Sequence, residues 1–131
     1  MKAADANVLE RASSEAVHFG DAELLAAIRR LAVLHIFEIR SAIASAEELF
    51  EAMAHAMELP DYFGRNWDAL HDALKDLAPD PGQRGFVLVI HNAEALWRDA
   101  ARVAGELVEV WLDAAAWWHD DGVPFHLVFV W

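Results

Sequence analysis

Asp68, His71 and Asp72 are the residues of this chain whose types and spacing are best suited to chemistry. Positions three and four apart share one side of an α-helix, so the two carboxylates and the imidazole would lie close together. Such a group can serve in general acid–base catalysis, in a mixed carboxylate–imidazole metal site, or in pairing with cations of a partner. His119, Asp120 and Asp121 form a second cluster of the same kind.

The local sequence predicts a helix that positions the first cluster. Asn66 is a good N-cap, and the helix should run from about Trp67 to Leu77. Its apolar residues recur at helical spacing and predict a buried stripe of Trp67, Leu70, Leu74 and Leu77. Upstream, Pro60 ends any preceding helix and Gly64 permits unusual backbone geometry. Tyr62 lies in this loop, beside the acidic side of the helix.

Motifs of known catalytic or metal sites do not accompany these clusters. The chain contains no H-E-x-x-H, no G-x-S-x-G and no glycine loop of the phosphate-binding type. With no cysteine it has no thiolate nucleophile and no cysteine-based zinc site. We therefore expect a protein that is not an enzyme and that needs neither a cofactor nor a metal ion.

The charge of the chain favours a basic protein partner. Its 22 acidic and 10 basic residues give a net charge of −12 at pH 7, and no basic cluster is present that could follow a phosphate backbone. Direct binding to nucleic acid is therefore disfavoured. A strongly acidic surface increases solubility, and it also accelerates association with a basic partner.

The run from Leu59 to Leu74 carries a resemblance to a known family. Read as L-P-D-Y-F-G-x-N-x-D-A-L-x-D-x-L, it resembles the signature of the barstars, intracellular protein inhibitors of ribonucleases. The resemblance is weaker but ordered from about Val33 to Trp131 and does not extend to the first 30 or so residues. It implies a stoichiometric inhibitor that binds a basic, barnase-like ribonuclease one to one and imitates RNA phosphates with carboxylates. The alternative is an acidic interaction module whose basic partner is not a ribonuclease.

The resemblance also assigns the partner-binding residues. The resemblance places Tyr62, Asp68 and Asp72 on the contact surface, and we include the neighbouring Gly64, Asn66 and His71 in the same surface. Gly64 and Asn66 are expected to shape the turn and the helix cap whatever the function. His71 departs from the family, which has a tryptophan at that position in its best-known member. The family has a further acidic contact on a later helix, and two alignments of this chain with it are possible. Matching the V-W-L-D-A pattern makes Asp113 its counterpart, whereas counting back from Gly122 gives Trp117. We prefer Asp113.

Alternation of strand and helix patterns predicts an α/β fold with a small parallel sheet of about three strands packed with helices. Three short apolar segments have strand character: Val33–Ile39, Phe86–Ile90 and Phe125–Val130. Phe86–Ile90 is an uninterrupted apolar run, which is typical of a strand that is covered on both faces. Helices are expected after the Ser45–Glu48 capping box, in a short turn capped by Asn92, and from about Ala101 to His119. The inner face of that last helix should contain Val103, Leu107, Val110, Ala114 and Trp117.

The boundaries are expected to be an N-terminal extension over residues 1–32 and a barstar-like domain over residues 33–131. Residues 1 to about 14 should be loose. A short strand at Ala16–Phe19 and a helix from Asp21 should follow, and these could extend the sheet, cover it, or do neither. No apolar run is long enough to span a bilayer and the first residues lack a secretory signal core, so we expect a cytoplasmic protein. Trp118 and Trp131, if exposed, are candidates for self-association.

Overall fold

Strands and helices alternate along the chain. The computed structural model describes residues 6–131 of the 131-residue chain. In order, its elements are η1 (Ala6–Glu10, a 3₁₀-helix), β1 (Val17–Gly20), α1 (Ala22–Ile28), β2 (Leu34–Ile39), α2 (Ala46–Ala56), α3 (Trp67–Lys75), β3 (Gly85–Ile90), α4 (Ala93–Asp99), α5 (Ala101–Asp120) and β4 (Phe125–Val130). Within residues 6–131, none of the helices has the length and apolar character needed to cross a membrane.

The strands form one parallel sheet in the order β1-β4-β3-β2. The predicted α/β fold with a parallel sheet is therefore confirmed. The expected number of about three strands is slightly low, because β1 pairs with β4 and becomes a fourth strand at the edge. In the pairing register Leu88 of β3 stands between Phe37 of β2 and Leu127 of β4.

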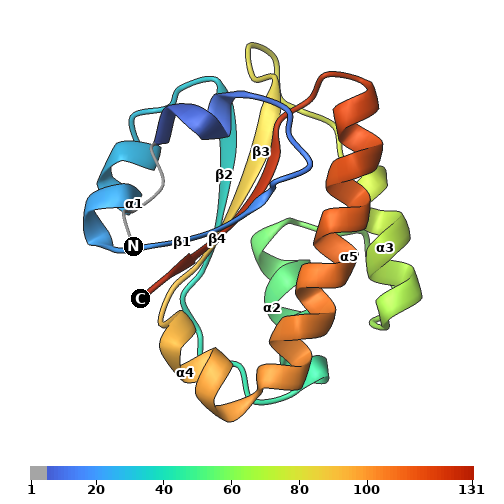
Figure 1. The fold of residues 1–131 in the computed structure, drawn as a ribbon. Coiled ribbons are helices and arrows are strands. Elements are labelled where there is room, and N and C mark those ends of the chain that lie inside the picture. The colour runs from blue at the N-terminus through green and yellow to red at the C-terminus, as the bar shows by residue number, and fades with distance from the viewer. Residues whose placement is uncertain (1–5) are drawn as a thin grey trace.

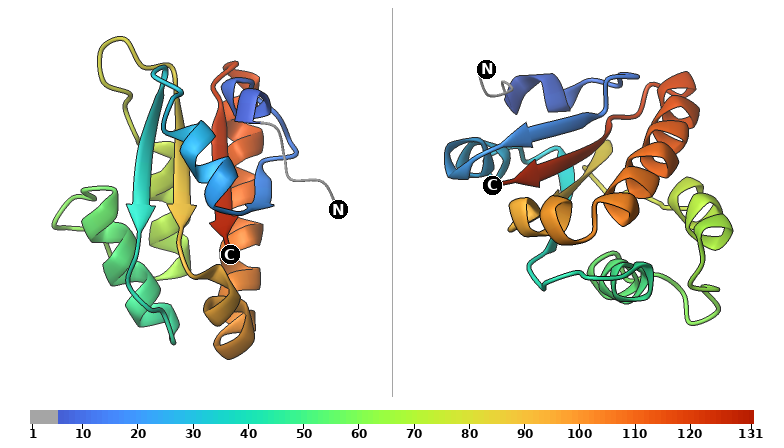
Figure 2. Two further views of the ribbon diagram at one scale, coloured as in Figure 1. Left: turned by 90° about the vertical axis from the view of Figure 1, so that its left-hand side faces the viewer. Right: turned by 60° about the horizontal axis from the view of Figure 1, so that its bottom comes forward.

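Both faces of the sheet are covered (Figures 1 and 2). Because side chains alternate between the faces of a strand, Phe86, Leu88 and Ile90 of β3 join the core beneath α2, α3 and α5. Val87 and Val89 join a second core beneath α1 and η1. All six residues of β3 are buried, as the uninterrupted apolar run predicted. The sheet thus holds α3 and α5 on one side and the N-terminal elements on the other.

The N-terminal segment both extends and covers the sheet. β1 adds the edge strand, while α1 contributes Leu24 and Ile28 to the second core. The expectation of a loose chain up to about residue 14 is wrong for Ala6–Glu10, because Leu9 of η1 is fully buried against that core. Residues 1–5 lie outside the described residues.

The helix caps follow the sequence in most places. Ser45 Oγ accepts a hydrogen bond from Glu48 N at 3.1 Å, so the predicted cap by Ser45 is present. The Glu48 carboxylate accepts from Ala44 N, one residue before the position that a capping box uses. The predicted cap by Asn92 is wrong, because this residue adopts a left-handed backbone (φ 55°) and its side chain makes no capping bond. Gly122, with φ 71°, ends α5 as predicted.

A buried pair of histidines joins β1 to β4. Neutral His126 donates from Nε2 to the carbonyl of Arg11 (2.7 Å), so its Nδ1 accepts from Nε2 of His18 (2.9 Å). Burial lowers the pKa of His18 to about 4, and the neighbouring His126 adds to this effect. Burial also lowers the pKa of His126, although its bond to Arg11 opposes the change. The N-terminal strand is therefore joined to the sheet by two neutral imidazoles.

Candidate functional site

The loop between α2 and α3 displays Tyr62. After α2 the chain turns with a bond from Leu59 N to Ala54 O (2.9 Å), and a second turn is closed from Phe63 N to Pro60 O (2.9 Å). Phe63 is buried in the main core, whereas Tyr62 beside it is 82% exposed. The loop is therefore anchored at one aromatic residue and presents the other to solvent.

Asn66 and Gly64 shape the start of α3. The Asn66 side chain accepts a hydrogen bond from Ala69 N (2.8 Å) and donates one to Gly64 O (3.2 Å), so the predicted N-cap is present. The unusual backbone expected at Gly64 lies instead at Arg65, whose φ is 51°. Gly64 instead avoids a close contact, because a Cβ at this position would lie only 3.3 Å from Ala69 Cβ. Both residues thus fix the direction in which α3 leaves the loop.

The solvent-facing side of α3 is acidic. Leu70 and Leu74 are buried beneath the helix, whereas Asp68 and Asp72 point to water. Asp68 lies in the first turn, where the helix dipole favours a negative charge. The Asp72 side chain is 88% exposed. Two carboxylates are therefore presented by a helix whose opposite side is fixed in the core.

His71 joins this helix to α5. Its Nε2 hydrogen-bonds the carboxylate of Asp113, and Lys75 Nζ lies 3.3 Å from the same nitrogen and 3.9 Å from an Asp113 oxygen. The bond from His71 lowers the pKa of the Asp113 carboxyl, and the positive charge of Lys75 adds to this. His71 Nδ1 is 4.0 Å from Asp72. Of the two residues considered for the later acidic contact, Asp113 is the one bonded to α3.

A buried tryptophan fixes the rotation of α5 beside α3. Trp118 Nε1 donates to the carbonyl of Leu74 (2.9 Å), which lies in the last turn of α3 and has no partner within its own helix. The expected orientation of α5 is therefore wrong at its C-terminal end, because Trp118 is 8% exposed and Trp117 is 43% exposed. Trp118 and Trp131 accordingly do not form an exposed pair, since only Trp131 reaches solvent.

An open groove of about 690 Å³ adjoins the acidic side of α3. Its floor includes Phe37 and Phe86, and its rim includes Asp72 and Asp76. Asp80, from the loop before β3, completes the rim 3.5 Å from His35. Sequence reasoning missed this groove, because its walls come from α3, the preceding loop and the starts of two strands.

The two clusters first considered for catalysis lie on α3 and at the end of α5. His71 is turned to a carboxylate of another helix, and His119, Asp120 and Asp121 lie exposed at the end of α5. Among residues 6–131, no group of three or more histidine or acidic side chains is placed to hold a metal ion.

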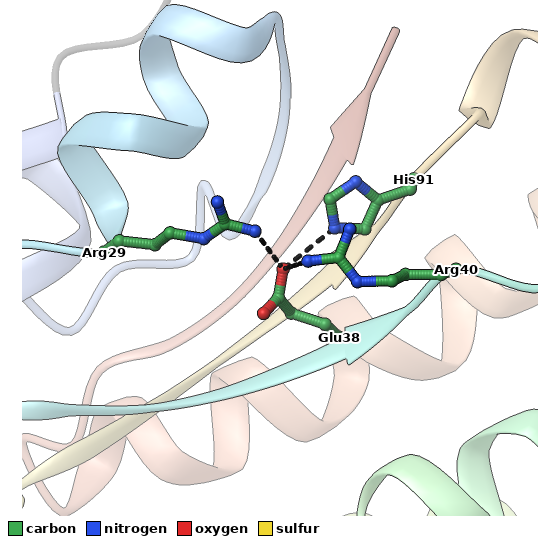
Figure 3. Close-up of polar contacts among 4 residues, drawn as sticks. All are labelled: Arg29, Glu38, Arg40 and His91. Atoms are coloured by element: carbon green, nitrogen blue, oxygen red, sulfur yellow. Dashed lines mark hydrogen bonds and ion pairs between the residues drawn. The ribbon is translucent and has the colours of Figure 1, made fainter.

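A polar cluster at the other side of the sheet was also missed from sequence (Figure 3). Arg29, Arg40 and His91 all point to one oxygen of Glu38, at 3.0, 3.1 and 2.9 Å. Burial raises the pKa of Glu38, but its hydrogen bonds and the arginine charges lower it to below the usual value. The cluster ties the end of α1 to the edge strand β2. His91 is 53 residues from Glu38 in sequence, so no local pattern indicates the complete cluster.

Residues 34–130 match the family model described as Barstar (barnase inhibitor). The matched segment is more than half of the chain and includes the loop at Tyr62, all of α3, and Asp113 of α5. No curated protein matches the chain.

Proposed function

Because the chain belongs to the barstar family, we propose that it is a stoichiometric inhibitor of a barnase-like ribonuclease. The observation that best supports this proposal is the pair of exposed carboxylates, Asp68 and Asp72, on a helix that packs against α5 and buries Leu70 and Leu74 in the core. With Tyr62, Gly64, Asn66, His71 and Asp113 they make up the proposed partner-binding face.

The proposed mechanism is imitation of RNA phosphates. A ribonuclease binds its substrate with cationic side chains, and arginine accepts a carboxylate in the same paired geometry as a phosphate. Asp68 and Asp72 would form ion pairs with these cationic side chains, and a carboxylate has no phosphodiester bond for the enzyme to cleave. Because the Asn66 cap and the buried stripe already fix α3, little conformational entropy is lost on binding.

The net charge of −12 supports rapid encounter with a basic enzyme. Opposite charges attract over a distance set by the salt concentration, so association should slow as salt rises. Asp113 is expected to contribute less than Asp72, since it already accepts a hydrogen bond from His71 and lies 3.9 Å from the Lys75 ammonium.

An acidic module with a basic partner of another kind is the second candidate, because the same exposed carboxylates would serve it. The two candidates differ in one measurable property. Only the inhibitor abolishes RNA cleavage at one equivalent of protein per equivalent of ribonuclease.

The test is a titration of a purified barnase-like ribonuclease, with RNA cleavage followed at low and at high salt. Asp72→Ala should cost about 2–5 kcal/mol of binding, chiefly through faster dissociation. The matched control is Glu94→Ala, which removes the same charge from the exposed surface of α4. Equal affinities of these two variants would exclude the proposed face. Absence of inhibition by the wild type, combined with capture of a basic protein that is not a nuclease, would favour the second candidate.

A further inference from the structure

The open groove beside α3 is lined by charge of predominantly one sign. Its lining includes the carboxylates of Glu58, Asp72, Asp76 and Asp80. Among the described residues that line it, Lys75 is the one lysine or arginine. Its Nζ lies 3.3 Å from His71 Nε2 and 3.9 Å from an oxygen of Asp113, so this cation is engaged at the contact between α3 and α5. The groove therefore offers several carboxylates that no basic side chain of its own lining neutralises.

Asp76 carries its charge where the fold gains nothing from it. It is the C-cap residue of α3, and the dipole of a helix disfavours a negative charge at this end. Its side chain is exposed, and none of the ion pairs within residues 6–131 includes it. Asp72 lies one turn before it on the same side of the helix. Both carboxylates are thus available to a group from outside the chain.

Asp80 lines the same groove from the loop before β3. Its side chain is 68% exposed, and one of its oxygens lies 3.5 Å from Nδ1 of His35. That nitrogen is buried and has no hydrogen-bond partner within the described residues. A carboxylate can accept about four hydrogen bonds, so most of the capacity of Asp80 is unused.

Apolar side chains complete the lining. Met57, Phe37 and Leu77 contribute to it, and the half-buried ring of His35 stacks on Phe37 with centroids 4.3 Å apart. A long side chain with an apolar stem and a charged end suits such a lining, because the stem lies on apolar surface while the charge meets the carboxylates. A guanidinium is favoured over an ammonium, because it pairs with two carboxylate oxygens at once and stacks on aromatic rings.

Charge and position decide which partner enters the groove. Nucleic acid and anionic membranes are repelled by its carboxylates, and a second copy of this chain would itself carry −12. Asp72 belongs both to the groove and to the proposed partner-binding face. A basic ribonuclease seated on that face therefore also covers the groove.

We propose that this groove is a specificity subsite of the partner-binding face, in which Asp76 and Asp80 receive an arginine side chain that the ribonuclease carries beside its cationic site. This inference rests on the proposed function. Asp68 and Asp72 would attract any basic ribonuclease, whereas the groove favours one that has an arginine in this position. Loss of the Asp76 and Asp80 charges should weaken binding about 10-fold to 100-fold, mainly through faster dissociation.

The first experiment removes these two charges and keeps the size of the side chains. Asp76→Asn/Asp80→Asn is compared with Glu23→Gln/Glu94→Gln, which removes two exposed charges from α1 and α4. A purified barnase-like ribonuclease is the probe. Dissociation constants are measured by calorimetry at several salt concentrations, and thermal unfolding of each variant checks its fold.

A second pair of variants fills the groove and leaves every charge in place. Ala78 is exposed and lines the groove, so Ala78→Leu should obstruct it. Ala26→Leu adds the same bulk at an exposed position of α1, on the other side of the sheet (Figures 1 and 2). Ala78→Leu should bind more weakly than Ala26→Leu and keep the salt dependence of the wild type, because no charge is removed.

Alanine substitution of each arginine of the ribonuclease then identifies the occupant. The inference predicts one arginine whose loss weakens binding to the wild type but not to Asp76→Asn/Asp80→Asn. If a lysine shows this behaviour and no arginine does, the assignment of the occupant is wrong.

The outcomes separate this inference from the proposed function. If Asp76→Asn/Asp80→Asn binds like its control and Ala78→Leu binds like Ala26→Leu, while Asp72→Ala binds weakly, the subsite is refuted and the inhibitor function remains. If the wild type does not bind the ribonuclease, both proposals fail. A dimer of the wild type that Asp76→Asn/Asp80→Asn dissociates would assign the groove to a second copy and overturn the inference.

Discussion

Acidification should destabilise this protein at the buried pair of His18 and His126. The pKa of His18 is lowered from 6.5 to about 4 by burial, with a further contribution from His126. Between these two values the unfolded chain binds a proton at His18 and the folded chain does not. The free energy of unfolding therefore falls as the pH decreases through this range, and this contribution is constant above and below it.

The size of the effect follows from the difference in pKa. A lowering from 6.5 to about 4 corresponds to about 3 kcal/mol for His18 once the pH is below both values. About 2 kcal/mol of this should be lost between about pH 7 and about pH 5. His126, whose pKa is also lowered, acts in the same direction. For a domain of this size such a loss is a large part of the total stability.

Urea unfolding followed by tryptophan fluorescence, repeated at several pH values, measures this effect. His18→Gln should be less dependent on pH than the wild type, because a glutamine amide can donate to His126 Nδ1 without titrating. His55→Gln, at an exposed position of α2, controls for the loss of a histidine and should keep the wild-type dependence.

Identical pH profiles for the wild type and His18→Gln would refute this reasoning. The carboxylates with lowered pKa, Glu38, Asp99 and Asp113, also lose stabilising contacts in acid. Their unfolded-state values are near 4.5 for glutamate and 3.8 for aspartate, so their contribution is lost at lower pH than that of the histidines. The pH range in which the histidines reduce stability therefore begins above that of the carboxylates, and the urea unfolding series can separate the two.

Substitutions at three further positions test the packing that supports the site. Asn66→Ala should cost about 1 kcal/mol of stability through loss of the α3 cap, and Asn66→Asp should retain most of it, as urea unfolding will show. Trp118→Phe should cost about 1–2 kcal/mol, because it removes the buried donor to Leu74 O; a variant as stable as the wild type would contradict this. Gly85→Ala should cost about 1–3 kcal/mol by thermal unfolding, because its Cβ would lie 2.7 Å from Pro124 O.

The region around α3 could be read from the sequence because its signals are local. The cap by Asn66, the buried Leu70 and Leu74 and the exposed Asp68 and Asp72 lie within nine residues of one another. A cap needs only its own first turn, and a helix repeat places polar and apolar residues on opposite sides. The core strands β3 and β4 were recognisable for a similar reason, because each is a continuous apolar run.

The rotation of α5 could not be read in the same way. Its sequence carries two overlapping apolar stripes, and both contain Leu107 and Ala114. The structure buries the stripe that includes Trp111 and Trp118, whose indole N–H groups reach the carbonyls of Phe125 and Leu74. The N–H group of a buried tryptophan is usually hydrogen-bonded. That partner lies on another element, so helical periodicity alone cannot choose between the stripes.

By itself the sequence determined the α/β class, the acidic helix and the resemblance to barstars, because these depend on charge, on local pattern and on a short signature. Only the tertiary structure decided that His71 pairs with Asp113 at a separation of 42 residues, and that His18 pairs with His126 at a separation of 108 residues. It also decided that the N-terminal segment covers the second face of the sheet. Contacts of this kind form when the sheet brings distant segments together, and they leave no periodic trace in the chain.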